Sequence, residues 1–468
     1  MRHIPIAALL AIFAFLHLHQ MGELSWTWDE AGDMGIVECL QRTGDPFACL
    51  DDISQTRLPF YIHALLGHHY WISFAFSAIT LLAVYAYARR EYGTWTATLF
   101  AALYVTSPAL LASGRMVLTH SAIVFTCFTT LSLLALMRGA GLGSPAHGGD
   151  GLKPVLRLGA LVACGVFTGL AGASHILAAF NLIFLVALYA TRFRPSWRDL
   201  WFLPIAAATF FATTVVYVSP PVLRALIDAC LAGGGKYSFW NYLGLGTTSA
   251  PWFFPFLLLL IKVGAWVVFA FHRQARWFLV ALLVNFGLKG TVFGYETPHH
   301  QVQFYPLLYL FVAVGIVTWW KKRVAVVVAV LFAIQLFDVI RFFPNYLFYG
   351  AQYGERFIGE FYGPAVLHAQ GRTEVWQVIE AIRVRHPEAK ILVADNNMFD
   401  ASGPPFVPFT KRDPRARYEF ALVDRLYATH FHFPERDAYN ALLARHYKAA
   451  YTTEFPTGVW VYRVMELR

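Results

Sequence analysis

Two adjacent carboxylates near the start of the chain, Asp29 and Glu30, are the residues of this sequence best placed for chemistry. They follow the apolar segment Ile4–Leu18, and Trp26 and Trp28 flank them. Tryptophan rings favour the membrane–water interface, and acidic groups at that depth are costly unless they bind a ligand or react. The pattern predicts a functional acidic pair beside a membrane. The alternative is a solvated helix N-terminus, where the helix dipole favours Asp and Glu.

The composition places the whole chain among membrane proteins. Hydrophobic residues make up 57% of the 468 residues, aromatic residues 17% and charged residues 14%, and the mean hydropathy is +0.50. A soluble domain has about 25% charged residues, so we expect a polytopic α-helical membrane protein. The formal net charge of +9 requires no nucleic acid as a partner, because most basic residues stand at the ends of apolar segments.

Apolar runs separated by charged or Gly/Pro-rich breaks predict about eleven transmembrane helices. They lie near residues 4–20, 71–88, 95–112, 120–137, 155–172, 175–191, 200–218, 252–271, 276–293, 302–319 and 324–342. The first run lacks a clear small-x-small cleavage site, so we expect it to remain as a helix rather than to be removed as a signal peptide.

The basic residues indicate how these helices are oriented. Alternate connections carry thirteen of them: Arg89, Arg90, Arg138, Lys153, Arg157, Arg192, Arg194, Arg198, Arg273, Arg276, Lys321, Lys322 and Arg323. The short connections on the other side offer Arg115 alone. The positive-inside rule then predicts a cytoplasmic N-terminus, with the loop of Asp29 and the C-terminus on the external, periplasmic face of the inner (plasma) membrane.

Beyond Phe343 the composition becomes more polar and indicates a second domain. Residues 1–342 form the predicted transmembrane domain and residues 343–468 a small external α/β domain. Helices are expected at Glu374–Arg385 and Asp437–His446, and strands at Lys390–Asp395, Phe420–Tyr427 and Val459–Val464.

The cysteines suggest one disulfide and no cysteine-based metal site. Cys39 and Cys49 share the first external loop, where the compartment is oxidising, so a bond between them is expected. Cys127 and Cys164 fall in predicted helices and are expected to act as small apolar residues.

Polar residues of four separate external segments are predicted to meet on one membrane face. The first loop contributes Asp29, Glu30 and Arg57, and the later segments contribute Arg115, His120, His175, His299 and His300. A structural protein has little use for such a convergence of acids, guanidinium groups and imidazoles, so the pattern favours an enzyme.

The motifs at these positions resemble a known family. They are Trp28-Asp29-Glu30, Thr56-Arg57-Leu58-Pro59-Phe60-Tyr61, Gly114-Arg115-Met116 and Gly169-Leu170-Ala171. In this order and on one face, they resemble the GT-C glycosyltransferases of the protein O-mannosyltransferase and aminoarabinose-transferase (RgtA-like) type. The resemblance runs from the first helix to about Val317.

This resemblance implies a GT-C fold, a polyprenyl-phosphate-linked sugar as donor, and transfer outside the membrane to a hydroxyl of a lipid, glycan or protein acceptor. It also implies that Asp29 is the general base, with Glu30 orienting it or binding a metal. Two positions depart from the family pattern. His120 stands where the family often has a second acid, and His175 stands where the family has a lysine.

The residue types at these positions suit the transfer of a sugar from a phosphate-linked donor. Transfer from a phosphate-linked sugar needs a carboxylate that accepts the acceptor's proton and a cationic cradle for the departing phosphate. Arg57 and Arg115 are the phosphate candidates, because guanidinium groups match phosphate oxygens. His299 and His300 could bind the phosphate, the acceptor or a divalent metal ion, and no other cofactor is expected.

Two other classes of protein stay open from the sequence. A transporter or lipid flippase should place charged or broken helices near the bilayer midplane, where this chain offers chiefly Lys262 and Lys289. A non-catalytic assembly protein is the third possibility, which loss of activity through the changes to His120 and His175 would favour.

Overall fold

The structure is a computed structural model, and it describes most of the chain in sixteen segments. They are residues 4–19, 28–44, 58–67, 70–115, 122–139, 154–175, 178, 181–192, 200–214, 276–288, 303–320, 323–341, 372–394, 406–424, 435–454 and 460–468. The chain forms two compact units, one of Met1–Met21 and Gly32–Tyr346 and the other of Gly22–Ala31 and Leu347–Arg468.

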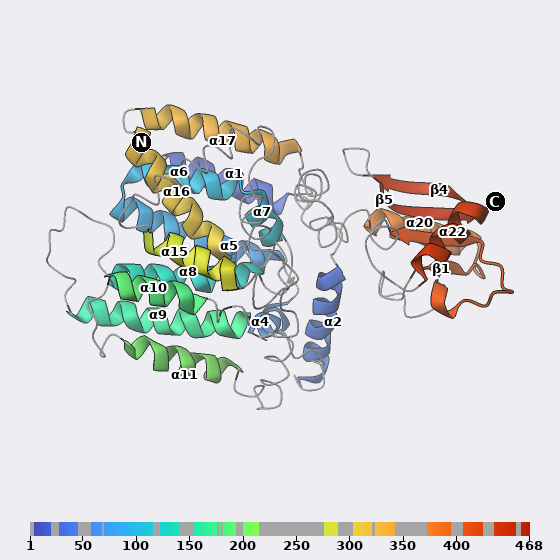
Figure 1. The fold of residues 1–468 in the computed structure, drawn as a ribbon, viewed down its shortest axis with the longest axis horizontal. Coiled ribbons are helices and arrows are strands. Elements are labelled where there is room, and N and C mark those ends of the chain that lie inside the picture. The colour runs from blue at the N-terminus through green and yellow to red at the C-terminus, as the bar shows by residue number, and fades with distance from the viewer. Residues whose placement is uncertain are drawn as a thin grey trace. The chain divides into compact units, whose positions relative to one another are not determined.

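The first unit is a bundle of apolar helices (Figure 1). Its described helices are α1 (Ile4–Leu18), α2 (Trp28–Thr43, which belongs to this unit from Gly32 on), α4 (Leu58–Leu66), α5 (Tyr70–Glu91), α6 (Thr94–Val105), α7 (Pro108–Arg115), α8 (Ala122–Gly139), α9 (Pro154–Ser174), α10 (Asn181–Arg192), α11 (Phe202–Thr214), α15 (Arg276–Leu288), α16 (Tyr305–Trp320) and α17 (Val324–Arg341). A helix covers each predicted span except 252–271, which lies outside the described residues. The total number of spans stays a prediction.

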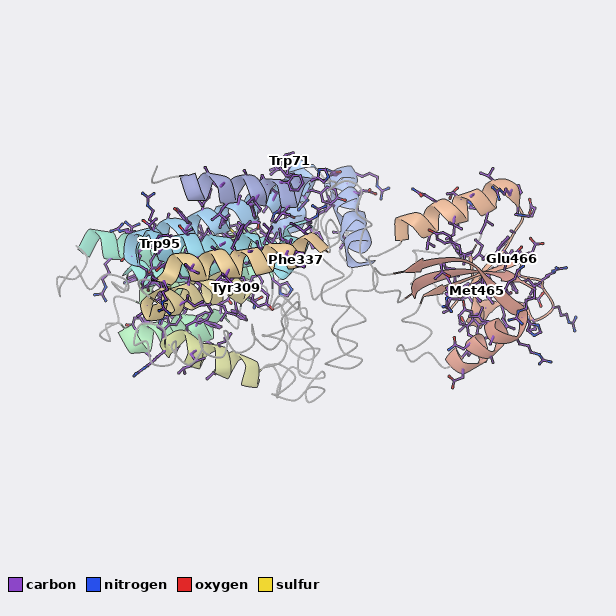
Figure 2. All side chains as sticks on the ribbon, turned by 90° about the horizontal axis from the view of Figure 1, so that it is seen from above. Trp71, Trp95, Tyr309, Phe337, Met465 and Glu466 are labelled. Atoms are coloured by element: carbon purple, nitrogen blue, oxygen red, sulfur yellow. The ribbon has the colours of Figure 1, made fainter. Side chains whose placement is uncertain are left out.

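Length and composition suit part of this bundle to a membrane. Among the described residues, Tyr70–Glu91 and Arg157–Ser174 are long and apolar enough to cross one, and several shorter apolar helices accompany them. Figure 2 shows Trp71 and Trp95 toward opposite ends of this unit. Their side chains are 60% and 50% exposed, as expected for aromatic rings at the two membrane–water interfaces.

The predicted span 95–112 is divided in two, so the expectation of one continuous helix there is wrong. Helix α6 ends at Val105 and α7 begins at Pro108. Proline lacks the N–H that would continue the helix and is favoured in a first turn. Ser107 caps the new helix, because its Oγ accepts a hydrogen bond from the Leu110 N–H at 3.4 Å. The same hydroxyl lies 2.9 Å from the Tyr309 hydroxyl of α16, which fixes the break within the bundle.

The first loop forms two helices that pack on each other. Val37 and Leu40 of α2 and Phe60 of α4 make a buried cluster. Gln41 adds a side-chain hydrogen bond from its Nε2 to the Ala64 carbonyl at 3.1 Å. These contacts hold α2 and α4 together.

Helices α9 and α11 lie side by side because α9 presents glycines to α11 (Figure 1). A Cβ atom added at Gly165 would lie 2.7 Å from the Phe202 carbonyl oxygen, and one at Gly169 would lie 2.6 Å from the Ala206 carbonyl oxygen. Small residues at this spacing let two membrane helices approach closely. The Gly-Leu-Ala motif that begins at Gly169 therefore has a packing role in this chain.

The second unit is built on a five-stranded mixed sheet. Its strands are β1 (Ile391–Val393), β2 (Phe406–Pro408), β3 (Phe420–Asp424), β4 (Tyr447–Glu454) and β5 (Trp460–Leu467), in the order β2-β1-β3-β5-β4. β1 is parallel to β2 and β3, whereas β5 is antiparallel to β3 and β4. Figure 2 shows the sheet, with Met465 and Glu466 labelled, between two helices, α20 (Arg372–Arg385) and α22 (Arg436–His446).

Tyr439 links α22 to the centre of this sheet. Its ring is fully buried, and its hydroxyl donates to the Leu422 carbonyl at 2.9 Å. Burial, with a smaller contribution from Tyr447, raises the pKa of the Tyr439 hydroxyl well above its ordinary value, so this residue has a structural role. That the unit lies outside the membrane stays a prediction.

Candidate functional site

The structure describes four of the eight candidate site residues. Asp29 and Glu30 are described in their backbone, and Arg115 and His175 also in their side chains. The other four, Arg57, His120, His299 and His300, lie outside the described residues, and their predicted roles are not tested.

Asp29 and Glu30 occupy the first turn of α2. Acidic residues are favoured there because the helix dipole is positive at its N-terminus. This position is what the alternative interpretation of Asp29 and Glu30, as acids at a helix N-terminus, requires. Catalysis by Asp29 stays a prediction.

Arg115 completes the end of α1. Its side chain is 2% exposed, and its Nη1 donates to the carbonyl oxygens of Leu16 at 2.7 Å, His17 at 3.0 Å and His19 at 3.0 Å. These carbonyls belong to the last turn of a helix, where no backbone N–H satisfies them. The guanidinium group therefore holds α7 against α1, and the predicted contact of Arg115 with a phosphate stays a prediction.

Gly114, which precedes Arg115 in the motif, has no room for a side chain. A Cβ atom there would lie 2.5 Å from Nε2 of His17 and 3.4 Å from Oγ of Ser77. The His17 ring is buried, with Nδ1 3.0 Å from the Phe13 carbonyl oxygen. Gly114 thus allows the close approach of α7 to α1 that brings Arg115 to its carbonyls.

His175 lies directly after α9 and faces α8. Its backbone N–H donates to the Ala171 carbonyl at 3.0 Å, and its ring stacks on Phe125 with centroids 5.3 Å apart. The ring is partly exposed, at the edge of a buried cluster that contains Phe125, Ala171 and Ala178. An imidazole here is held by an aromatic face and keeps access to the surface of the bundle.

The sequence analysis did not predict three uncharged polar residues that lie on α8, at the start of α10 and just before α16. On α8, one turn after Phe125, Thr129 accepts a hydrogen bond from Nδ2 of Asn181 at 2.8 Å. Asn181 is the first residue of α10, and Gln303 directly precedes Phe304 before α16 begins. We call Thr129, His175, Asn181 and Gln303 the polar cluster. Amides at the starts of two apolar segments were the signal that could have found it.

Aromatic stacking places Gln303 beside α10. The Phe304 ring stacks on Phe184 of α10, with centroids 4.7 Å apart, and Phe184 lies one turn after Asn181. The polar cluster thus draws on the interior of α8, the end of α9, the start of α10 and the residue before Phe304 and α16, which are distant in sequence. Under the predicted topology the end of α9 and the starts of α10 and α16 are external.

A metal site is not evident in the described ranges. They hold no group of three or more His, Cys, Asp or Glu side chains arranged to bind an ion. His299 and His300, which the sequence offers for a divalent metal, fall outside those ranges, so that possibility is untested.

The first loop contains a disulfide-bonded cysteine. Cys39 of α2 is in a disulfide. Cys49, its predicted partner, lies outside the described residues, so the pairing itself stays a prediction. Cys127 and Cys164 are buried free thiols, in agreement with their predicted role as apolar residues.

Comparisons by sequence find no described family and no curated protein that matches this chain. Comparison by structure finds matching proteins. The crystal structure of apo ArnT from Cupriavidus metallidurans superposes with a TM-score of 0.55 at 14% identity, over 98% of this chain and 97% of ArnT. ArnT bound to undecaprenyl phosphate gives 0.54 at 15% identity, over the same shares. The archaeal oligosaccharyltransferase AglB from Archaeoglobus fulgidus, in complex with an inhibitory peptide and a dolichol-phosphate, gives 0.46 at 14% identity, over 98% and 74%.

These comparisons show that the chain shares the fold of ArnT. The two ArnT superpositions cover nearly the whole of both chains. The resemblance to the aminoarabinose-transferase type that the sequence motifs indicated is therefore confirmed at the level of the fold.

Proposed function

We propose that this chain is a membrane glycosyltransferase that moves a sugar from a polyprenyl-phosphate donor to an acceptor hydroxyl at the external membrane face. The observation that carries the proposal is the full-length likeness to ArnT, which has been crystallised with undecaprenyl phosphate. The predicted topology supports the face, because it sets Asp29 and the external helix ends on one side of the membrane. The acceptor is a lipid, a glycan or a protein.

In the proposed reaction Asp29 takes the proton of the acceptor hydroxyl as that oxygen attacks the anomeric carbon of the donor. The bond between that carbon and the phosphate oxygen breaks, and polyprenyl phosphate leaves with the electron pair. No acid is needed to protonate the leaving group, because the phosphate carries its charge well. This chemistry differs from the paired carboxylates of glycoside hydrolysis.

Cationic groups are proposed to stabilise the charge that develops on the phosphate. Arg57 is the leading candidate, because the guanidinium group of Arg115 already binds the end of α1. His120, His175, His299 and His300 complete the proposed substrate-binding set. A divalent ion held by Glu30 or the His299–His300 pair is a further part of the proposal.

The test separates catalysis from donor binding. Asp29→Asn preserves the size of the side chain but cannot accept the proton, so we expect transfer to fall by about 10²–10⁴-fold. Binding of undecaprenyl phosphate should persist, because other groups hold the phosphate. The control is Glu30→Gln, which alters the neighbouring carboxylate and should cost less if Glu30 only orients.

Transfer is measured with purified full-length protein in nanodiscs, radiolabelled polyprenyl-phosphate sugars, and a membrane extract as the source of acceptor. Near-normal transfer by Asp29→Asn would show that another group is the base. Movement of the lipid across the bilayer without a new glycosidic bond would instead identify a flippase.

A further inference from the structure

Two amide side chains in the polar cluster are buried without complete hydrogen bonding. Gln303 is 1% exposed, and neither its Oε1 nor its Nε2 has a hydrogen-bond partner within the part of the chain that the structure describes. Asn181 is 4% exposed, and although its Nδ2 donates to Thr129, its Oδ1 accepts no hydrogen bond from any described group. A buried unpaired amide costs about 1–3 kcal/mol, and native proteins satisfy such groups with a ligand or with ordered water.

The two amides belong to neighbouring elements. Phe304, next to Gln303 in the chain, stacks on Phe184, which follows Asn181 by one turn of α10. The hydrogen bond from Asn181 to Thr129 ties the same turn to α8. The amide groups therefore lie at one end of the bundle, beside aromatic rings and next to the helix turn that carries Phe125 and the stacked His175.

Thr130, which follows Thr129 on α8, adds an unsatisfied hydroxyl. A helical threonine commonly donates to the carbonyl four residues earlier, as Thr80, Thr106 and Thr168 do in this chain. The Thr130 hydroxyl is fully buried and makes no such bond, nor any other among the described residues. The unsatisfied groups on α8, α10 and α16 share one property, which is that they are polar without charge.

We propose that Gln303 and Asn181 bind the sugar part of the lipid-linked donor, a neutral ring that carries several hydroxyl groups. An amide supplies both donors and acceptors, and each sugar hydroxyl can accept and donate, so the two match without any charge. A phosphate would instead select cationic partners. The buried rings of Phe184 and Phe304 stack on each other and so hold together the two elements that carry the amides. The inference rests on the proposed function and names the group that the same site recognises.

The experiment compares two lipids on wild-type and variant protein. Purified full-length protein in nanodiscs is titrated with undecaprenyl phosphate and with undecaprenyl phosphate carrying mannose or glucose, and the Kd of each is measured by native mass spectrometry. Wild-type protein should bind at least one of the sugar-bearing lipids about 10-fold more tightly than the bare carrier, as expected for two net hydrogen bonds.

Gln303→Met keeps the length of the side chain and removes the amide, so it should abolish that 10-fold preference while leaving the Kd of the bare carrier unchanged. Asn181→Leu should reduce the same preference and is an independent variant if Gln303→Met does not fold. The matched control is Thr96→Val, because the Thr96 hydroxyl is also buried and uncharged but lies in the first turn of α6, at the predicted cytoplasmic end, where it donates to the Tyr92 carbonyl at 3.2 Å. It should leave the preference intact.

Three results would overturn the proposal. One is equal binding of the sugar-bearing and bare lipids by wild-type protein. Another is a preference that Gln303→Met and Asn181→Leu both keep, since the amides would then hold ordered water only. The third is a loss of preference in Thr96→Val as large as in Gln303→Met, which would point to general damage. Failure of the proposed function is distinguishable, because wild-type protein would then transfer no sugar in the assay above, whether or not it binds the lipids.

Discussion

Replacing Gly169 by alanine should destabilise the bundle, although alanine is the better helix former. Gly169 lies in α9, and a Cβ atom there would lie 2.6 Å from the Ala206 carbonyl oxygen, 2.6 Å from Cβ of Thr209 and 2.8 Å from the backbone nitrogen of Phe210. Real Cβ atoms rarely come closer than about 3.4 Å to such neighbours, and two of these contacts are with backbone that cannot rotate away. Helix α11 would have to move by several tenths of an ångström.

Two opposing free-energy contributions decide whether Gly169→Ala stabilises or destabilises the protein. Alanine in place of glycine stabilises a helix interior by about 0.8–1.0 kcal/mol. Forcing an extra methyl group into a packed contact costs about 1–3 kcal/mol, and more where backbone must shift. At Gly169 both terms act, so a net loss of about 1–2 kcal/mol is expected. At Gly159, on the same helix, no described atom lies within 4 Å of the added Cβ, so Gly159→Ala should instead stabilise by up to about 1 kcal/mol.

The assay uses thiols that the protein already has. Cys127 and Cys164 are buried and free, so a thiol-reactive dye reports their exposure as the protein unfolds on heating in detergent. At roughly 2 °C per kcal/mol for a unit of this size, Gly169→Ala should lower the unfolding midpoint by about 2–4 °C. Gly159→Ala should hold or raise it. If both variants unfold at the same temperature or above the wild type, the close approach of α9 and α11 is wrong.

Three further outcomes are expected. Arg115→Met should lower the unfolding midpoint more than Gly169→Ala does, because it removes the two Nη1 hydrogens that three carbonyls at the end of α1 share, and charge-assisted bonds are worth about 1.5–3 kcal/mol each; an unchanged midpoint in the same dye assay would remove its structural role. Mass spectrometry without reductant should find Cys39 joined to Cys49, in a bond worth roughly 3 kcal/mol by the loop-entropy argument, and Cys39 joined elsewhere would refute the pairing. Reporter fusions after Arg323 and Arg468 should report the cytoplasm and the exterior respectively, and a cytoplasmic C-terminus would contradict the topology.

The positions of the helices could be predicted from the sequence because burial in lipid demands long apolar runs, and those runs are visible in the residues themselves. The break within 95–112 was missed for a specific reason. Ser107 and Pro108 lie in an apolar run whose mean composition does not change, and only their local chemistry ends α6. In the second unit the short strand β2 was missed because it lies among Pro404, Pro405 and Pro408, and proline disfavours a strand. β4 (Tyr447–Glu454) was missed because its sequence does not alternate.

The candidate site was predicted less completely. The site was predicted from charged residues, and Arg115 shows why a charge alone is ambiguous. A guanidinium group can bind helix carbonyls as well as phosphates. Gly169 shows the same ambiguity, because a motif glycine can mark a substrate or a close helix contact. The uncharged Asn181 and Gln303 escaped attention because amides at the start of a helix are common, and only their burial distinguishes them.

The contact of Arg115 with α1 also bears on how the protein is made. The carbonyl groups at the end of the first helix depend on a side chain that lies 98 residues further along the chain than His17. The first helix is synthesised and enters the membrane long before that side chain exists. The carbonyl groups at the end of α1 are therefore bonded only once α7, which follows α5 and α6 in the chain, has been made. The bonds from Arg115 of α7 to α1 therefore form late in assembly. A chain that stopped before residue 115 would leave the carbonyl groups at the end of α1 without the Arg115 side chain that binds them.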